Sequence, residues 1–242
     1  MANTSYKAIS VGDPEVSVVI PAFNEEDNIL PTLASLAANK TKRVVEIIVV
    51  NNNSTDGTET LVRNTGVKCI LENRQGITFA RNSGLAVAKG KYILNADADT
   101  IYPADWIEQM TAPLEDKGIS LTYGRFAFLP IAETGRRTYF LYEHLARFSR
   151  WINKIFKDEA VNVYGFNSGF RREQGIAVEG FDHPQGTNED GWLALKLRDK
   201  GFGKLHLVTD IRALTWTTDR RIQIDGGLIK GSLKRISRVL GG

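Results

Sequence analysis

Short β-branched runs alternate with segments of helical periodicity through the first hundred residues, and this alternation limits the possible folds more than any other feature. The strand-like runs occupy 16–20, 44–50, 67–71 and 92–95. Helical spacing is found over 25–38 and over 76–89, where Gly90 is expected as the C-terminal cap, and another helix should start within the polar loop 51–57. Strands that alternate with helices pair in parallel through right-handed crossovers. We therefore predict a Rossmann-like α/β fold with a mixed, mostly parallel sheet flanked by helices.

The second half of the chain has a less regular pattern. We expect helices over 103–117, 136–157, 188–200 and 228–240, with Pro103 in the first turn of one and Gly201 ending another. Strands are expected over 119–129 and, as one or two segments, within 203–216. No internal repeat, low-complexity run or linker interrupts the pattern, so we predict one domain over residues 1–242.

The composition is that of a globular protein rather than of a secreted disulfide protein or a membrane protein. The 242 residues are 42% hydrophobic and 24% charged, enough for a sizeable core. The single cysteine, Cys69, excludes an internal disulfide and lies in an apolar run, so we expect a reduced core thiol. Residues 1–12 are polar, and no apolar run approaches the roughly 20 residues of a membrane span. We therefore expect a cytoplasmic protein.

Positive charge is concentrated in two segments, although the net charge is only +3. Segment 136–157 has six basic residues against one acid, and segment 217–242 has six against two, so the rest of the chain is acidic. An acidic body with two basic segments suits a metal site beside an anionic partner or surface, and we expect no nucleic-acid partner.

Each basic helix has two interpretations, packing on the body of the protein or contact with a membrane. For 136–157 we favour packing, because an apolar stripe of its width is ordinary for a helix on a sheet. For 228–240 we expect peripheral contact with the inner face of a membrane, since basic amphipathic helices are drawn to anionic lipid.

Two carboxylates follow the buried run 92–95 directly. Asp97 and Asp99 are two positions apart, and alternate side chains of an extended chain point to the same side. The polar loop 51–57 follows another predicted parallel strand, and ligands of such sheets bind beyond the carboxyl ends of the strands. A hard divalent cation is the natural guest of such a carboxylate pair. We therefore expect a metal and ligand site at this edge of the sheet.

The chain resembles a family-two glycosyltransferase of the GT-A fold, from about residue 16 to residue 221. Each block is weak alone, but four in the family's order, with natural spacing, are specific. The blocks are Val-Ser-Val-Val-Ile-Pro-Ala-Phe-Asn-Glu at 16–25, Ile-Ile-Val-Val-Asn-Asn-Asn-Ser-Thr-Asp-Gly at 47–57, Gly-Ile-Thr-Phe-Ala-Arg-Asn-Ser-Gly at 76–84 followed by Asp97-Ala98-Asp99, and Asn188-Glu189-Asp190. The resemblance divides the single domain into a nucleotide-binding half (1–100), an acceptor-side half (101–221) and a basic tail (222–242).

The resemblance implies an inverting, metal-dependent enzyme that moves a sugar from a nucleoside diphosphate sugar to an acceptor hydroxyl. The acceptor would be a glycan or lipid-linked, as in polysaccharide, glycolipid or cell-envelope glycan synthesis. Asp99 would hold Mg²⁺ or Mn²⁺, and Asp97 would bind the ribose, the metal shell or both. Asp190 would be the catalytic base, and Glu189 would position the acceptor; the alternative is an acidic helix start that favours the helix dipole.

The same resemblance implies a set of donor-binding residues: Pro21, Ala22, Asn24, Glu25, Asn52, Asp56, Arg74, Gly76, Arg81, Asp97, Asn167, Arg220 and Arg221. Segment 165–172 resembles the small-residue loop under the donor sugar, and 216–221 would close over the diphosphate. A helix cap explains Asp56 equally well, and a surface salt bridge is the alternative for Arg74 and Arg81. His144, His183 and His206 are interpreted as core or surface residues.

The loop Asn51-Asn52-Asn53 departs from the family pattern, which often has acids at its first two positions. An asparagine amide can both accept from and donate to a base, so binding remains expected while the identity of the base stays open; a plain turn is the alternative. The sequence also leaves open the donor sugar, the acceptor and the oligomeric state.

Two other function classes are alternatives to a transferase. One is a non-catalytic nucleotide-sugar-binding module, against which the intact Glu189-Asp190 pair argues. The other is a nucleotidyltransferase, which would need a glycine-rich, basic loop after the first strand. Segment 21–27 is acidic instead.

Overall fold

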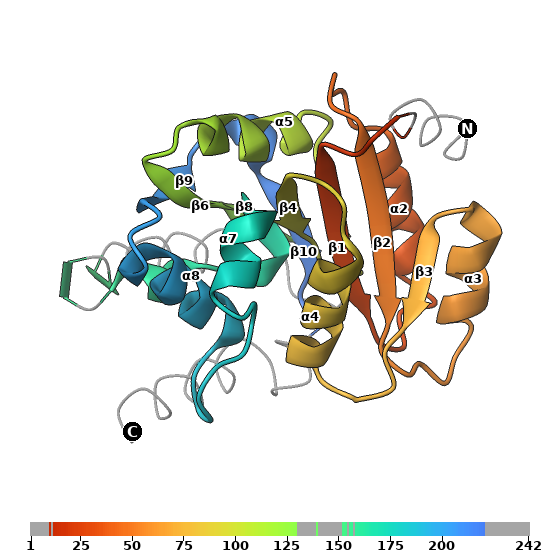
Figure 1. The fold of residues 1–242 in the computed structure, drawn as a ribbon. Coiled ribbons are helices and arrows are strands. Elements are labelled where there is room, and N and C mark those ends of the chain that lie inside the picture. Colours follow the sequence, from red (N-terminus) through yellow and green to blue (C-terminus); the bar gives the residue numbers. More distant parts are fainter. Residues whose placement is uncertain are drawn as a thin grey trace.

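The computed structural model describes residues 10, 12–129, 139, 152–153, 155–156 and 158–220 and confirms the predicted α/β fold (Figure 1). Most of the predicted helix 136–157 and all of 228–240 lie outside these residues. Within them, no helix combines the length and the apolar character that crossing a membrane requires.

The main sheet has seven strands in the order β3-β2-β1-β4-β8-β6-β9. Its strands are β1 (Val16–Ala22), β2 (Val45–Asn51), β3 (Lys68–Leu71), β4 (Tyr92–Asn95), β6 (Ile119–Gly124), β8 (Ser168–Arg171) and β9 (Lys204–Val208). All neighbouring strands are parallel except that β8 runs antiparallel to both β4 and β6. The prediction of a mixed, mostly parallel sheet is confirmed.

Helices cover both faces of this sheet. They are α2 (Ile29–Ala37), α3 (Thr58–Thr65), α4 (Ile77–Val87), α5 (Trp106–Thr111), α7 (Arg172–Ala177) and α8 (Glu189–Asp199), with 3₁₀ turns η1 (Ala112–Glu115), η2 (Glu159–Asn162), η3 (Gly165–Asn167) and η4 (Ile211–Ala213). Alternate residues of β1 enter two separate cores: Val18 and Ile20 pack with α2 and α5, whereas Val19 packs with α4 and α8. In Figure 1, α4 lies in front of the sheet and α2 behind it.

Pro21 lies inside β1 without breaking a ladder hydrogen bond. The Ala22 carbonyl faces β2 and accepts from Asn52 N–H at 2.8 Å, whereas the Val19 carbonyl accepts from Ala96 at 3.0 Å on the β4 side. The missing N–H of Pro21 would point to the β4 side, where pairing has already ended at Val19. A proline is tolerated where no ladder bond is due.

Two predicted helices are shorter than expected, for identifiable reasons. The first begins at Ile29 rather than 25, because Glu25 is tied back to the next loop by a hydrogen bond from its N–H to Thr58 Oγ1 at 2.8 Å. The helix predicted over 103–117 is α5 followed by η1. Pro113 in η1 has no N–H to continue the α-helical pattern.

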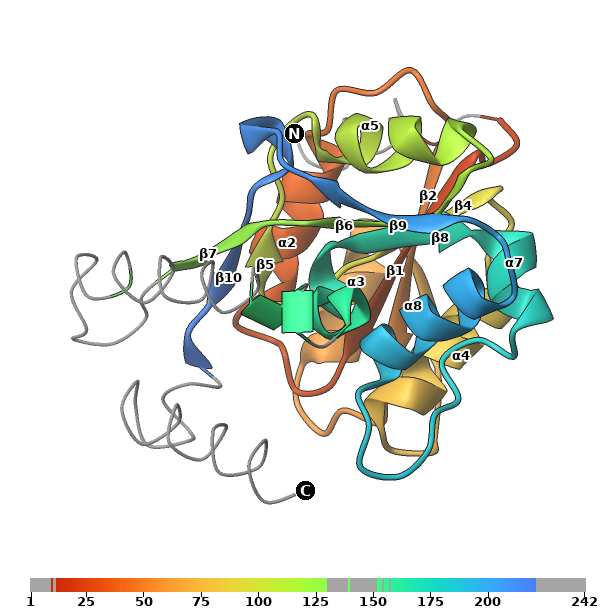
Figure 2. The same ribbon diagram turned by 90° about the vertical axis from the view of Figure 1, so that its left-hand side faces the viewer.

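A second, three-stranded sheet joins distant parts of the chain in the order β5-β10-β7. Its strands are β5 (Thr100–Ile101), β7 (Phe126–Leu129) and β10 (Thr215–Thr218), and Figure 2 shows them to one side of the main sheet. The strand predicted over 119–129 is therefore divided at Arg125 between two sheets. Antiparallel pairing of Thr217 with Thr100 brings the end of the described chain beside Asp99.

Segment 165–172 was predicted as a loop under the donor sugar, and this is wrong for most of its length. Ser168–Arg171 is β8, a central strand of the main sheet, and Arg172 begins α7. A Cβ on Gly169 would lie 2.5 Å from Leu94 Cδ2, so glycine is required here by packing between strands. Only η3 remains as an irregular segment.

The predicted role of Gly90 as a helix cap is also wrong. Helix α4 is capped at Ala88, and Gly90 instead approaches β1, where its N–H donates to Ser17 Oγ at 2.8 Å. A Cβ at Gly90 would lie 2.5 Å from the Ser17 nitrogen and 2.6 Å from the Val16 carbonyl carbon. Both of these atoms are backbone and cannot rotate away.

Gly90→Ala should therefore destabilise the protein by about 1–3 kcal/mol, the usual cost of overpacking. The measurement is the free energy of unfolding in urea. Gly118→Ala is the matched control, because its Cβ would meet only the Asp116 side chain, at 3.2 Å. Equal stability of Gly90→Ala and Gly118→Ala would contradict the proposed close approach.

Candidate active site

The loops after β1 and β2 are clasped together at the carboxyl edge of the sheet. Asn24 adopts a left-handed conformation, with φ of 55°, and its Oδ1 accepts from Thr55 N–H at 2.8 Å. In the same sense, Glu26 Oε2 of the first loop accepts from Gly57 N–H of the second at 2.7 Å. The two predicted donor-binding loops thus form one structural unit.

Asp56 lies in this clasp, two residues before α3 begins at Thr58. Its carboxylate accepts from Thr58 N–H at 3.0 Å and from Glu26 N–H at 3.1 Å. Burial alone would raise the pKa of Asp56, but the hydrogen bonds from Thr58 and Glu26 lower it below its usual value. The N-cap of α3 is Gly57, so Asp56 holds the turn before the helix rather than capping it, and its contact with the donor stays a prediction.

Asn51 and Asn52 are buried, and their amides bond to protein. Asn52 Nδ2 donates to the carbonyls of Glu72 and Arg74, at 3.0 and 2.8 Å, and its Oδ1 accepts from Gly76 N–H at 2.8 Å. Asn51 Nδ2 donates to Glu59 Oε2 at 2.9 Å. Asn52 and Gly76 therefore hold the loop after β3, and their contact with a base stays a prediction.

Arg74 lies on the outer surface of this loop. Its guanidinium pairs with both carboxylate oxygens of Glu72, at 3.1 and 2.9 Å, and its Cζ lies 4.7 Å from the Phe79 ring centroid. The hydrogen bonds from Arg74 and Ser83 lower the pKa of Glu72 to about 2. The alternative of a surface salt bridge describes this arrangement, and a role in donor binding stays a prediction.

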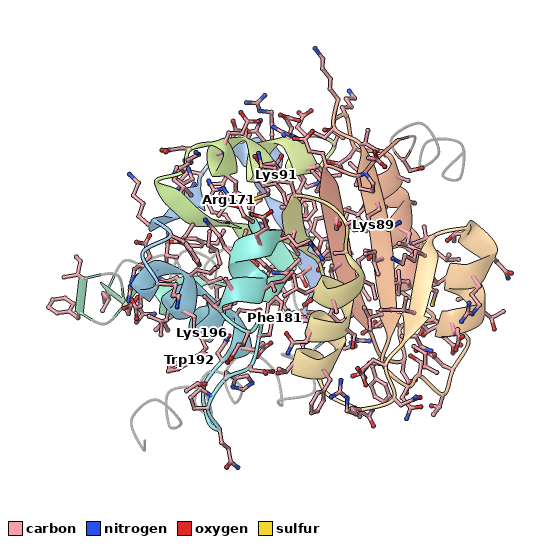
Figure 3. All side chains as sticks on the ribbon, in the orientation of Figure 1. Lys89, Lys91, Arg171, Phe181, Trp192 and Lys196 are labelled. Carbon is pink, nitrogen blue, oxygen red and sulfur yellow. The ribbon has the colours of Figure 1, made fainter. Side chains whose placement is uncertain are left out.

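Arg81 differs from Arg74 because it is buried, with only 3% of its surface exposed. From α4 it reaches three carboxylates: Asp190, Glu189 at 3.0 Å and Asp97 at 3.5 Å. Its Cζ also lies 5.6 Å from the ring centroid of Phe181, which Figure 3 labels. Its Nε atom is buried without a hydrogen-bond partner. The surface salt-bridge alternative is therefore wrong for Arg81.

Asp190 is the most buried of these acids, at 6% exposure. It accepts hydrogen bonds from Arg81 and, at 2.7 Å, from the N–H of Gly165. Burial raises the pKa of Asp190 to about 7, and the charges of Glu189 and Asp97 act in the same direction against the lowering effect of Arg81. A carboxylate that titrates near neutral pH is suited to accept a proton.

The start of α8 does not need Glu189 or Asp190 as caps. Asn188 Oδ1 accepts from the N–H groups of Asp190 and Gly191, at 2.8 and 3.1 Å, and so caps the helix itself. Both acidic side chains instead face Arg81. Glu189 and Asp190 therefore do more than favour the helix dipole, because both pair with Arg81.

Gly165 completes the pocket around Arg81. A Cβ at this position would overlap the Arg81 guanidinium, and the Gly165 N–H is bonded to Asp190. Gly165 was predicted to lie under the donor sugar. The structure shows a specific reason for glycine, because any side chain would displace Arg81 from its carboxylates.

Asp97 and Asp99 follow β4, and both side chains are partly exposed, at 35% and 18%. The N–H of Asp97 donates to Tyr102 Oη at 2.9 Å, and that hydroxyl donates to the Phe166 carbonyl at 3.0 Å. Asp99 Oδ2 accepts from Thr218 Oγ1 at 2.7 Å, and its backbone carbonyl accepts from Thr218 N–H at 3.3 Å. Thr218 belongs to the predicted segment 216–221, but its contact with Asp99 was not predicted, because only the pairing of β5 with β10 brings the two residues together.

Arg220 lies between two of the predicted site acids. Its guanidinium pairs with Glu25, and its Nη2 atom lies 3.6 Å from Asp99 Oδ2. Glu25 is buried and also accepts from Asn28 Nδ2 at 3.0 Å. Glu25, Asp99 and Arg220 are therefore brought together as predicted, whereas Arg221 lies outside the described residues.

Asn167 is brought to a different place from the one predicted. It is 1% exposed. Its Nδ2 donates to the carbonyls of Arg125 and Ala213, at 2.8 and 3.2 Å, and its Oδ1 accepts from Trp106 Nε1 at 2.8 Å. We correct its assignment from donor binding to a buried link between α5, η4 and the strand junction at Arg125.

The two described histidines, His183 and His206, were interpreted from the sequence as core or surface residues. His183 Nε2 lies 3.2 Å from Thr78 Oγ1, and this contact joins α4 to the loop before α8. Lys196, labelled in Figure 3, supports the same loop by donating to the Gly180 and Asp182 carbonyls at 2.7 and 2.9 Å. His206 lies on β9, and His144 lies outside the described residues.

The carboxylate pair fits Mg²⁺ or Mn²⁺ better than a metal with an all-protein shell. Among the residues that the structure describes, no group of three or more His, Cys, Asp or Glu side chains forms a metal cage. Mg²⁺ typically takes one or two carboxylates and completes its shell with water and substrate phosphates. Two partly exposed carboxylates at the sheet edge match that requirement.

Replacing Arg81 tests whether the buried network has been identified correctly. Arg81→Gln leaves three carboxylates around a lost cation and should cost about 3–5 kcal/mol of unfolding free energy. The buried acids then bind protons more tightly in the folded than in the unfolded state, so stability falls as pH rises. The deficit should be larger at pH 8 than at pH 5.

Urea unfolding at both pH values measures this effect. Arg74→Gln is the control, because its side chain is exposed and its loss should only return the pKa of Glu72 towards the ordinary value, below pH 5. The cost of Arg74→Gln should therefore be nearly the same at pH 5 and pH 8. A deficit for Arg81→Gln that does not change with pH would contradict the network.

Comparison with known proteins identifies relatives of this arrangement. Residues 17–174 match Glycosyl transferase family 2. The chain is 30% identical over 122 residues to glycosyltransferase AglE of Haloferax volcanii, covering 48% of this chain and 40% of that protein. It is 31% identical over 115 residues to UDP-Glc:alpha-D-GlcNAc-diphosphoundecaprenol beta-1,3-glucosyltransferase WfaP of Escherichia coli, covering 46% of this chain and 45% of that protein. The chain thus spans less than half the length of these relatives.

Solved structures show the same fold. The mannosyltransferase PcManGT of Pyrobaculum calidifontis, in complex with GDP-Man and Mn²⁺, has a TM-score of 0.64 at 22% identity, covering 93% of this chain and 65% of that one. TarS of S. aureus in complex with UDP-GlcNAc has a TM-score of 0.63 at 18% identity, covering 84% and 58%. The fold is GT-A. Because the family match extends over more than half of its residues, the chain belongs to glycosyl transferase family 2.

Proposed function

We propose that the protein is an inverting, metal-dependent glycosyltransferase that moves a sugar from a nucleoside diphosphate sugar to an acceptor hydroxyl. The observation that carries the proposal is the buried Arg81, which joins Asp97 after β4 to Glu189 and Asp190 at the start of α8. One guanidinium thus links the acid proposed for the donor side with the acids proposed for the acceptor side.

On the donor side, Asp99 would hold Mg²⁺ or Mn²⁺, with Asp97 completing the protein's share of the shell or binding the ribose. When bound, the metal would neutralise the charge that develops on the departing diphosphate. Thr218 orients the Asp99 carboxylate by donating to Oδ2 at 2.7 Å. Glu25, the Asn24 loop and Arg220 would surround the diphosphate and ribose.

On the acceptor side, Asp190 would take the proton of the attacking hydroxyl, and Glu189 would orient the acceptor. The pKa of Asp190, about 7, suits this carboxylate to accept a proton near neutral pH. Attack by the acceptor in a single displacement, without an enzyme nucleophile, inverts the anomeric configuration. The alternative of a non-catalytic binding module would not require the acids of α8 to be held beside Asp97.

For substrates, we propose a nucleotide-sugar donor and a glycan or lipid-linked acceptor, in cell-envelope glycan synthesis. The support is the acceptor named for the WfaP relative and the nucleotide sugars in the two similar structures. Cytoplasmic location, with 228–240 at the inner face of a membrane, remains part of the proposal.

Asp190→Asn should reduce the rate of sugar transfer by about 100- to 10,000-fold, because it removes the base while preserving shape. The wild-type kcat/KM should rise with pH up to about 7, the pKa of Asp190, and level off above it. Asp199→Asn, at the exposed end of the same helix, is the control. Transfer by Asp190→Asn at the control's rate would exclude Asp190 as the base.

The metal site is tested with a thermal-shift panel of UDP, GDP, dTDP and CDP, each with and without Mn²⁺. One nucleotide should raise the melting temperature much more in the presence of Mn²⁺, and this would also identify the base. Asp99→Asn should abolish the Mn²⁺-dependent part of the shift, whereas Asp199→Asn should retain it. A nucleotide shift that is the same with and without Mn²⁺ would contradict metal dependence.

A further inference from the structure

Arg220 lies beside Asp99, the carboxylate proposed to hold the metal. Its Nη2 atom lies 3.6 Å from Asp99 Oδ2 while the same guanidinium pairs with Glu25. Thr218 Oγ1 donates to that same Oδ2 atom at 2.7 Å. The other oxygen, Oδ1, has only a long contact of 3.4 Å from Thr100 Oγ1.

Two arginines lie among five acids of the site, and they differ in their freedom to move. Arg81 is buried and committed to Asp97, Glu189 and Asp190, so it cannot move easily. The Arg220 side chain is 38% exposed and is therefore the cation that can change partner.

A divalent cation and this guanidinium compete for the same carboxylate. A cation bound at Asp99 would lie within a few ångströms of Arg220. The two positive charges would repel each other, and the repulsion is stronger than in bulk water because the site is partly shielded from solvent. A diphosphate offers Arg220 a new, bidentate partner of opposite charge. It would draw the guanidinium away from Asp99 Oδ2 and leave that oxygen to the metal.

We propose that Arg220 couples metal binding to nucleotide binding, by pairing with Asp99 before the donor binds and transferring to the diphosphate when it binds. This rests on the proposed function, because it takes a nucleoside diphosphate and a divalent metal as the ligands. The consequence is that the metal binds weakly alone and tightly together with the nucleotide. By thermodynamic linkage, the metal strengthens nucleotide binding by the same factor.

The first experiment measures Mn²⁺ binding in the absence of nucleotide, from the electron paramagnetic resonance signal of free Mn²⁺. Arg220→Gln removes the competing charge and should bind Mn²⁺ about five- to tenfold more tightly than the wild type, the lower part of the usual range of coupling. Arg220→Lys keeps the charge and should remain close to the wild type. Arg212→Gln is the matched control, since Arg212 is an exposed arginine of the preceding η4 turn that pairs with Asp210.

The second experiment measures the binding of UDP, GDP, dTDP and CDP by calorimetry, once in EDTA and once with saturating Mn²⁺. In the wild type, Mn²⁺ should strengthen binding of the preferred nucleotide at least about fivefold. In Arg220→Gln the ratio of the two affinities should fall towards one, whereas Arg212→Gln should keep the wild-type ratio. Thermal melting checks that each variant is folded.

The outcomes separate this inference from the function on which it rests. If the wild type binds Mn²⁺ and a nucleotide but Arg220→Gln leaves both the Mn²⁺ affinity and the ratio unchanged, the coupling role is overturned and Arg220 is only a structural ion pair of Glu25. If the wild type binds none of UDP, GDP, dTDP and CDP with Mn²⁺, the proposed function fails and the inference fails with it.

Discussion

The arrangement of the site depends on one buried guanidinium, that of Arg81, held among three carboxylates. Removing a charge from water is costly, and the cost is recovered only where partners surround it closely. Helix α4 provides the arginine, the turn after β4 provides Asp97, and α8 provides Glu189 and Asp190. The pairing therefore requires the two halves of the chain to pack together before either side of the site is complete. Gly165 is part of the same requirement, because a side chain there would occupy the space of the guanidinium.

A second constraint acts on Asp99 and comes from the small sheet. Strand β10 pairs with β5 directly after Asp99, so Thr218 bonds to both its carboxylate and its backbone carbonyl. Arg220 follows two residues later and reaches across to Glu25 on the first loop. A residue 119 positions away in the sequence thus orients the Asp99 carboxylate, and the neighbouring Arg220 pairs with a residue 195 positions away. Asp97 is instead held by its ion pair with Arg81. The two acids of this short motif are therefore positioned by different parts of the fold.

Features set by local sequence could be predicted, whereas features set by distant partners could not. The β-branched runs and the helical periodicity were enough to predict the sheet, with Asp97 and Asp99 directly after β4. Glu189 and Asp190 were assigned to the site by the family resemblance, and Arg81 joins them to Asp97. The burial of Arg81 could not be predicted, because it depends on how close α8 lies to α4. Asn167 was assigned to the donor for its neighbours in the sequence, but its amide is used by Arg125, Ala213 and Trp106. Gly90 looked like a helix cap, and only its approach to Ser17 shows why it is glycine.

The asparagines that depart from the family pattern have a physical explanation in the loop that they hold. Both amide hydrogens of Asn52 go to the carbonyls of Glu72 and Arg74. A carboxylate only accepts hydrogen bonds, so an aspartate at this position would face two carbonyl oxygens with no proton to offer. Asn51 likewise donates to the carboxylate of Glu59, which would repel an acid. The neutral pair is therefore demanded by the way this chain closes the loop after β3.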